Sequence, residues 1–339
     1  MFQKALSLDP DDSYALSKYG EYLSEIGDKS QAAEMYHRAF LNSNDKYHET
    51  CRNDLFIQLQ ESNKVVLSGL DRQLQNLHFQ IIDSISRNDF NKFSKKMFVE
   101  QVYHSVAIEG NTLKFNQVKK CLKSDRIPRN FHRISIKEVN EILGVADAFQ
   151  YANWTVYRQI QEVAETGKRD YPRMLNLELI RDLHMRIIGR VDPGIAGVYR
   201  KGDVFVSGYK PPSAGSLIDL MSDFEDWLLK MEYECFIERR VHPIQFAAES
   251  HYRLVKIHPY QDGNGRLSRL LMNLIMMRAG YPPTLIKVSD RQRYFKALDY
   301  DHLFQNYIIK ATRETLLMYF DEFNLDSNLN SIADMKDEL

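Results

Sequence analysis

The side chains best suited to chemistry stand in one short stretch, His258-Pro259-Tyr260-Gln261-Asp262-Gly263-Asn264-Gly265-Arg266-Leu267-Ser268-Arg269. The imidazole of His258 titrates near neutrality and can take a proton from a hydroxyl group. Asp262 supplies a hard oxygen ligand for Mg²⁺ that bridges phosphates, and the two glycines let the backbone approach a phosphate closely. Arg266 and Arg269 are three residues apart, so both lie on one face of a helix. Together these residue types favour transfer of a phosphorus-containing group to a protein hydroxyl.

The pattern around this stretch predicts a helix, a loop and a second helix. The first helix, over residues 243–257, begins with Pro243, and Pro259 disfavours its continuation. The second is predicted over residues 266–279, because Gly280 and then two prolines follow it. The loop presents unpaired N–H groups at a helix N-terminus, which is an anion-binding arrangement. The chain has no GxxxxGKS/T loop and no protein-kinase signature, which argues against both of those classes.

The stretch from His258 to Arg269 resembles the Fic-domain signature HxFx(D/E)GNGRxxR, with Tyr260 in place of the usual Phe. Fic proteins transfer AMP from ATP to hydroxyl side chains, so the resemblance implies a protein adenylyltransferase that uses ATP with Mg²⁺ or Mn²⁺. It implies that His258 is the general base and that Asp262 holds the metal ion. The implied contacts with the phosphates of ATP, with Arg269 on the γ-phosphate, come from Asp262, Gly263, Asn264, Gly265, Arg266, Leu267, Ser268 and Arg269.

A second stretch, Ser105-Val106-Ala107-Ile108-Glu109-Gly110-Asn111, resembles the Fic inhibitory helix, (S/T)xxxE(G/N). A guanidinium binds a carboxylate through two parallel hydrogen bonds, so Glu109 is expected to pair with Arg269. The pairing would occupy the arginine that the γ-phosphate of ATP needs. The same carboxylate could orient a water molecule onto a modified hydroxyl. We therefore expect a chain that is autoinhibited for AMP transfer and that also removes AMP.

Two further segments resemble nucleotide-binding and target-binding parts of Fic domains. Val204, Phe205, Val206 and Ser207 predict a small β-hairpin that resembles the Fic flap. The resemblance implies that these residues contact ATP, and the open edge of the flap could hold a target segment by main-chain pairing. Tyr294 and Phe295 fall where the family places aromatic rings around adenine, with Phe295 replacing a usual Tyr and His302 a usual Asn. These two replacements leave a different donor open, such as UTP or a phosphocholine carrier. We interpret three further histidines of the core, His184, His242 and His251, as structural or surface residues.

The N-terminal residues contain a repeat. Phe2, Ala5 and Pro10 recur 34 positions later as Tyr36, Ala39 and Asn44, and 34 is the period of the tetratricopeptide repeat. An ordinary helical hairpin is the alternative. The sequence therefore predicts an all-α fold with tetratricopeptide repeats over 1–46 (the first one truncated), connecting helices over 47–87, a Fic-fold helical core with one small β-hairpin over 88–323, and a tail over 324–339. Because a truncated repeat needs a neighbour, we expect an upstream segment that could carry a membrane anchor or signal.

Composition and short motifs bear on compartment and partners. The 339 residues carry a formal net charge of −1, so no basic field favours a nucleic-acid partner. The chain ends in Lys336-Asp337-Glu338-Leu339, a retention signal of the endoplasmic reticulum, and Asn153-Trp154-Thr155 is an N-glycosylation sequon. These motifs predict residence in the lumen of the endoplasmic reticulum.

The order of repeat, connecting helix and Fic core is similar to a metazoan group of Fic proteins of the endoplasmic reticulum. This resemblance implies the chaperone BiP as the target protein and a homodimer formed through the Fic domain, with the stretch around Ile136 as the counterpart of the dimer contact. A different class of function is an interaction scaffold, in which the repeats bind chaperones and the Fic site is vestigial. The intact His258, Asp262 and Arg269 argue against that alternative.

Overall fold

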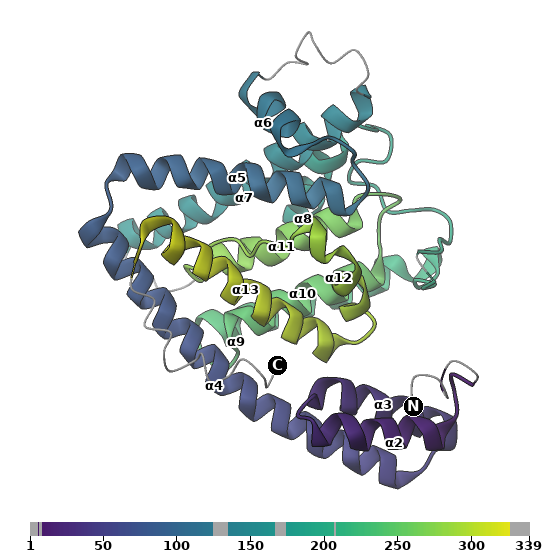
Figure 1. Cartoon of the computed structure of the whole chain (residues 1–339). Helices are drawn as coiled ribbons and strands as arrows, with labels where there is room; N and C mark the ends of the chain where they lie inside the picture. The colour runs from purple at the N-terminus through teal and green to yellow at the C-terminus, as the bar shows by residue number, and fades with distance from the viewer. Residues whose placement is uncertain (1–5, 7–8, 125–134, 167–173, 207, 326–339) are drawn as a thin grey trace. The chain divides into compact units, whose positions relative to one another are not determined.

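The computed structural model describes residues 6, 9–124, 135–166, 174–206 and 208–325 (Figure 1). Their regular structure is helical, and the β-structure among them consists of two isolated bridges. The described chain divides into two compact units, one formed by residues up to His78 and one by Phe79–Asn324. None of the described helices combines the length and the apolar character that crossing a bilayer requires.

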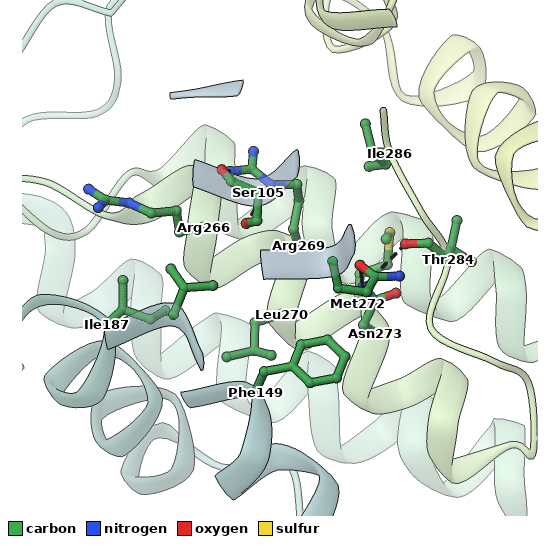
Figure 2. Close-up of a pocket in the computed structure, with 12 residues that line it drawn as sticks. Ser105, Phe149, Ile187, Arg266, Arg269, Leu270, Met272, Asn273, Thr284 and Ile286 are labelled. Carbon is green, nitrogen blue, oxygen red and sulfur yellow. Dashed lines mark hydrogen bonds between the residues drawn. The ribbon is translucent and has the colours of Figure 1, made fainter. Parts of the chain in front are cut away.

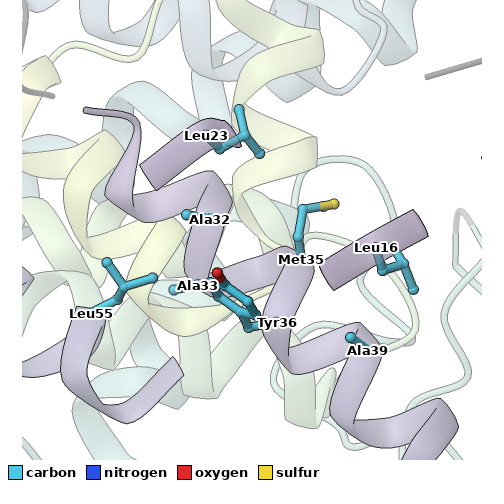
Figure 3. Close-up of a cluster of buried hydrophobic side chains, with 8 residues drawn as sticks. All are labelled: Leu16, Leu23, Ala32, Ala33, Met35, Tyr36, Ala39 and Leu55. Carbon is cyan, nitrogen blue, oxygen red and sulfur yellow. The ribbon is translucent and has the colours of Figure 1, made fainter. Parts of the chain in front are cut away.

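The N-terminal unit is built on a pair of helices, α2 (Ser13–Glu25) and α3 (Lys29–Ser43). Asp12 and Asp28 cap them by accepting hydrogen bonds from main-chain N–H groups of the first turn. Figure 3 shows the apolar cluster between these helices and α4, formed by Leu16, Leu23, Ala32, Ala33, Met35, Tyr36, Ala39 and Leu55. The interlocking small and large residues of the repeat are thus buried. The predicted division into domains stays a prediction.

A single helix, α4 (Lys46–Ser84), follows and crosses the division between the two units. The sequence predicted one or two connecting helices over this stretch, and the structure has one. The second unit holds nine further α-helices among the described residues: α5 (Arg87–Ile108), α6 (Phe115–Ser124), α7 (Ile136–Thr166), α8 (Leu177–Ile188), α9 (Leu217–Phe236), α10 (Pro243–Ile257), α11 (Asn264–Arg278), α12 (Arg291–Ala297) and α13 (Asp301–Phe323).

Helix α11 is the central element of this second unit (Figure 1). Nearly every residue of α11 is buried, from Asn264 at its start to Arg278 at its end. Helices α5, α7 and α8 pack on one side of it, and α10, which carries α9 and α13, packs on the other. A helix surrounded in this way buries side chains on all sides, and from Leu270 to Met276 those of α11 are apolar except for Asn273. Polar residues at its N-terminal end are therefore held in fixed positions by the core below them.

The structure corrects two expectations in detail. The predicted hairpin is reduced to one bridge, in which Val206 and Tyr209 exchange main-chain hydrogen bonds of 2.8 Å across a turn, and Ser207 lies outside the described residues. Val204 and Phe205 are not assigned to a strand, and the Phe205 side chain is 71% exposed. Helix α11 begins at Asn264, two residues before its predicted start, because Gly263 turns the chain with a φ of 84°.

Candidate active site

The loop between α10 and α11 is fixed by its own side chains. Helix α10 ends at His258, whose φ of 52° lies in the left-handed region, and Pro259 prevents the helix from continuing. Asn264 then closes the loop, because its Oδ1 accepts from the Tyr260 N–H at 3.0 Å and its Nδ2 donates to the Tyr260 carbonyl at 2.8 Å. The amide of Asn264 therefore holds the loop closed instead of pointing toward a ligand.

His184 of α8 supports the same loop from below. Its ring stacks on Tyr260 with a centroid distance of 3.6 Å, and its Nε2 lies 2.9 Å from the Asp262 carbonyl. The Gly197 N–H donates to Nδ1 at 2.9 Å, so Nε2 carries the proton and the imidazole is neutral. Burial lowers the pKa of His184 to about 4. The sequence identified this histidine as structural, and no local pattern indicated that it holds Asp262.

The side chain of His258 is arranged as a proton acceptor. Its Nδ1 lies 3.3 Å from the Val255 carbonyl, which can only accept, so Nδ1 carries the hydrogen and the lone pair is on Nε2. Burial lowers the pKa of this imidazole below its ordinary value, and the nearby Arg200 guanidinium acts in the same direction. The ring is therefore neutral at physiological pH, which is the protonation state that a general base requires.

Asp262 lies beside the start of α11 as an ionised carboxylate. Its Oδ1 accepts from Arg266 at 2.7 Å and from the Gly263 N–H at 2.6 Å. Burial alone would raise the pKa of this carboxyl, but Arg266 and the Gly263 N–H hold it below the ordinary value. The described residues contain no group of three metal-ligating side chains. A divalent cation that shares one carboxylate with substrate phosphates needs no such group, so Asp262 fits the role.

The N-terminus of α11 is an anion site. The first three N–H groups of a helix have no carbonyl partner inside it, and here they belong to Asn264, Gly265 and Arg266. The Nε of Arg266 is buried and has no hydrogen-bond partner within the described chain. Because a buried donor without an acceptor is costly, this atom indicates a ligand oxygen. The arrangement suits a phosphate group at this helix end.

A carboxylate of the protein lies at this anion site. Glu109 ends α5, and its Oε1 accepts from Arg269 at 2.7 Å. A Cβ atom added to Gly265 would lie only 2.3 Å from the same oxygen, so the close approach requires glycine there. The predicted pairing of Glu109 with Arg269 is therefore present. A negative charge at this position is favoured both by the arginine and by the helix dipole.

Three further donors of Arg269 are also engaged. The guanidinium donates to the Ser105 carbonyl at 2.9 Å and to the Ser105 hydroxyl at 3.3 Å, both on α5. Its third nitrogen donates to the Tyr294 hydroxyl at 3.2 Å. The side chain of Arg269 is only 5% exposed. In this conformation protein groups use four of the five N–H donors of the arginine.

The predicted adenine contacts lie in different surroundings. Tyr294 is 1% exposed and its hydroxyl is shared between Arg269 and His251, so this ring is enclosed by the protein. Phe295 is half-buried on α12, with the Arg291 guanidinium 4.7 Å from its ring centroid. His302 is half-buried near the start of α13. Phe295 and His302 are thus partly exposed, whereas Tyr294 is buried.

A small cavity lies behind Arg266 and Arg269, between α5 and α11 (Figure 2). Its volume is about 20 Å³, which is enough for one water molecule. Its polar lining includes Asn273, whose buried Oδ1 has no partner among the described residues. The cavity is far too small for a nucleotide. The side of the α10–α11 loop that faces away from this cavity is where Glu109 lies.

The low pKa of His184 makes the loop sensitive to acid. A histidine whose pKa is lower in the folded than in the unfolded protein stabilises the fold fully above about pH 6.5. That contribution is lost as the pH falls toward about 4, the pKa in the folded protein. We expect the wild-type chain to lose roughly 3 kcal/mol of unfolding free energy through this group between pH 7 and pH 4.

The measurement is urea unfolding at several pH values for the wild type and for His184→Gln. The variant has no group at this position that titrates, so its unfolding free energy should fall less steeply with acid. Equal slopes for the two proteins would contradict the assignment of a neutral, buried imidazole at the loop.

Comparisons with known proteins agree with this geometry. Residues 174–276 match the Fic/DOC family. A protein adenylyltransferase Fic of Aedes aegypti is 35% identical over 329 residues, which are 94% of this chain and 61% of that protein. A protein of the same name from Nematostella vectensis is 34% identical and is matched over 70% of its length. The chain thus spans about three-fifths of the length of the Aedes relative.

Solved structures give the same fold. Fic-1 from C. elegans superimposes with a TM-score of 0.76 at 25% identity, covering 95% of this chain and 90% of that one. A Fic-domain signalling protein from Bacteroides thetaiotaomicron has a TM-score of 0.62 at 24% identity and shares the fold. The predicted all-α Fic fold is confirmed. The chain belongs to the Fic/DOC family.

Proposed function

We propose that this chain transfers AMP from ATP to a hydroxyl side chain of another protein. The observation that carries the proposal is a neutral imidazole with a free Nε2 in the same loop as an anion-binding helix end. The relatives from Aedes and Nematostella are named protein adenylyltransferases, which supports the same reaction. The chain spans only part of the Aedes relative, so the activity of the whole protein is part of the proposal.

The reaction follows from the residues of the loop. The oxygen of the target hydroxyl attacks the α-phosphorus of ATP, the bond from that phosphorus to the bridging oxygen breaks, and pyrophosphate leaves. His258 Nε2 takes the proton of the attacking hydroxyl. The N–H groups of α11 and the Arg266 guanidinium bind the phosphate oxygens. A divalent cation held by Asp262 would neutralise charge on the leaving pyrophosphate.

We propose that the wild-type chain is autoinhibited for this transfer by Glu109. The carboxylate lies against Gly265 at the anion site and engages the Arg269 guanidinium at 2.7 Å. A γ-phosphate would need the same arginine, and two negative groups at one helix end repel each other. Removal of AMP from a modified target is the second part of the proposal. In that reaction, the Glu109 carboxylate would orient a water molecule toward the phosphorus.

The target, the compartment and the assembly are proposed on sequence resemblance. The chaperone BiP is the proposed target and the lumen of the endoplasmic reticulum the proposed compartment, with Lys336–Leu339 as the retention signal. Asn153 is exposed on α7, as a glycosylated residue has to be. Ile136 at the start of α7 is 65% exposed, which suits the proposed homodimer contact. The retention signal lies outside the described residues.

The alternative donors are distinguished by competition. The half-buried Phe295 is the specific feature that keeps another base open, because it lacks the hydroxyl of the usual tyrosine. Unlabelled UTP or a phosphocholine carrier would compete with labelled ATP if either were the true donor. The scaffold alternative predicts instead that His258→Ala leaves every cellular effect of the chain unchanged.

Substitution of Glu109 and His258 tests the reaction, the base and the inhibition together. Purified wild type, Glu109→Gly and Glu109→Gly/His258→Ala are incubated with α-labelled ATP, Mg²⁺ and purified BiP. We expect Glu109→Gly to raise transfer about 10- to 100-fold, the factor that corresponds to one charged hydrogen bond of about 1.5–3 kcal/mol. The second substitution should then reduce transfer by about 10²–10⁴-fold, because it removes the proton acceptor.

Glu100, which lies on the same helix and pairs with His104, supplies a matched control. Glu100→Gln should leave wild-type transfer unchanged. Equal transfer by wild type and Glu109→Gly would remove the autoinhibition proposal, and full transfer by the double variant would remove the assignment of His258.

The pH dependence of transfer tests the protonation state of the base. Burial lowers the pKa of His258, so the ring stays neutral, and active, at pH values where an exposed histidine is half protonated. We expect the transfer rate of Glu109→Gly to fall as the pH is lowered and to reach half its maximum only below about pH 6.5. An acid midpoint above that value would show that His258 is not the group whose protonation stops the reaction.

A further inference from the structure

A buried arginine outside both sequence motifs connects the catalytic loop to the segment that would hold the target. The Arg200 side chain has no exposed surface. Its Nε donates to the His258 carbonyl at 2.8 Å, and its two terminal nitrogens donate to the Gly202 carbonyl at 3.0 Å and the Pro212 carbonyl at 2.5 Å. One planar guanidinium therefore binds three main-chain carbonyls from three different segments.

The main chain beside Arg200 is attached to the same loop. The Arg200 N–H donates to the Pro259 carbonyl at 2.9 Å, and Tyr199 forms an antiparallel bridge with Tyr260. Because the backbone and the side chain of Arg200 bind neighbouring residues of the loop, this residue cannot shift relative to His258 without breaking several hydrogen bonds. The position of Arg200 relative to the loop is thus fixed by these hydrogen bonds.

Gly202 and Pro212 mark the two ends of the segment that we call the flap, residues 203–206 and 208–211. Within it, one bridge between Val206 and Tyr209 closes the turn, and no strand pairs with Val204 or Phe205 in the described chain. Asp203 adds a second contact between the two ends of the flap, because its Oδ1 accepts a hydrogen bond from the Ala214 N–H at 2.8 Å. The position of the flap relative to His258 is therefore set at its ends by Arg200 and near its turn by Tyr209, whose hydroxyl donates to the Lys256 carbonyl at 3.2 Å.

Arg200 also fixes the backbone of the catalytic histidine. His258 has a φ of 52°, a left-handed conformation that is unfavourable for a residue other than glycine. The hydrogen bond from Arg200 to its carbonyl favours this conformation. The nearest carboxylate, that of Asp203, is 4.0 Å away and half exposed, so the arginine is directed mainly at carbonyls. Lysine has one nitrogen and cannot reach all three carbonyls at once.

From these contacts we propose that Arg200 is a positioning residue, which fixes the distance and orientation between the flap and His258. The inference rests on the proposed transfer reaction. A target segment bound along the flap would present its hydroxyl to His258 Nε2 only while the flap and His258 keep this distance and orientation. None of the recorded side-chain hydrogen bonds of Arg200 reaches residues 262–269, so the phosphate site does not depend on it.

The test uses Glu109→Gly as the active parent and adds Arg200→Lys or Arg200→Met. Transfer of label from α-labelled ATP to purified BiP gives kcat and KM, calorimetry gives the Kd for ATP, and thermal unfolding gives Tm. We expect kcat to fall about 10- to 100-fold in both variants, because a displacement of about 1 Å can cost about 10² in rate. The Kd for ATP should stay within about twofold of the parent, since the phosphate site is intact.

Arg278 provides the matched control. It is a second buried arginine, at the far end of α11, and it pairs with Glu232 instead of with the loop. Arg278→Lys in the same parent should lower Tm while kcat and the Kd for ATP stay close to those of the parent. Arg200→Lys keeps the charge and most of the volume, so it remains informative if Arg200→Met fails to fold.

Three results would overturn the inference. Unchanged kcat in folded Arg200→Lys would show that the register does not depend on the guanidinium. A fall in kcat with an equal loss of ATP affinity would indicate general disruption of the fold. If the Glu109→Gly parent itself transfers no AMP, the proposed function is wrong and this inference falls with it. If the parent transfers AMP and Arg200→Lys in that parent transfers it equally well, only this inference is wrong.

Discussion

The N-terminus of α11 is a place where the fold needs a negative charge, and most of the site is arranged around that need. Three N–H groups, the Arg266 side chain and the Arg269 guanidinium converge there. In this structure two carboxylates supply the charge, Asp262 on Arg266 and Glu109 on Arg269, with Glu109 directly against Gly265. The same place suits a phosphate group. The proposed autoinhibition is a competition for this place between the Glu109 carboxylate and a phosphate of the proposed donor.

The rest of the larger unit keeps this helix end in place. α11 is buried along its length, so its first turn cannot tilt without disturbing the core. His184 supports Asp262 from α8, Asn264 closes the loop on Tyr260, and Arg200 ties the loop to the flap. Each of these residues supports another residue of the loop. Glu109 comes from a different helix, α5, whose C-terminal part hydrogen-bonds to Arg269 of α11.

The parts of the site that the sequence could predict are those set by neighbouring residues. The bounds of α10 follow from Pro243 and Pro259, and the loop residues follow from a motif of consecutive letters. The pairing of Glu109 with Arg269 spans 160 positions, and it was predictable only because both residues belong to motifs of one family. His184 and Arg200 act across 78 and 58 positions and belong to no such motif, so nothing local indicates their partners. Tyr294, which is expected beside adenine, is almost fully buried, and the sequence could not show this because burial depends on how α12 packs against α10 and α13.

A crystal structure of Glu109→Gly with a non-hydrolysable ATP analogue and Mg²⁺ tests the central claim most directly. The account predicts that the triphosphate lies on the N–H groups of Asn264, Gly265 and Arg266, with the side chain of Arg269 turned onto its terminal phosphate. A triphosphate bound elsewhere, with this helix end still without an anion, would contradict the account.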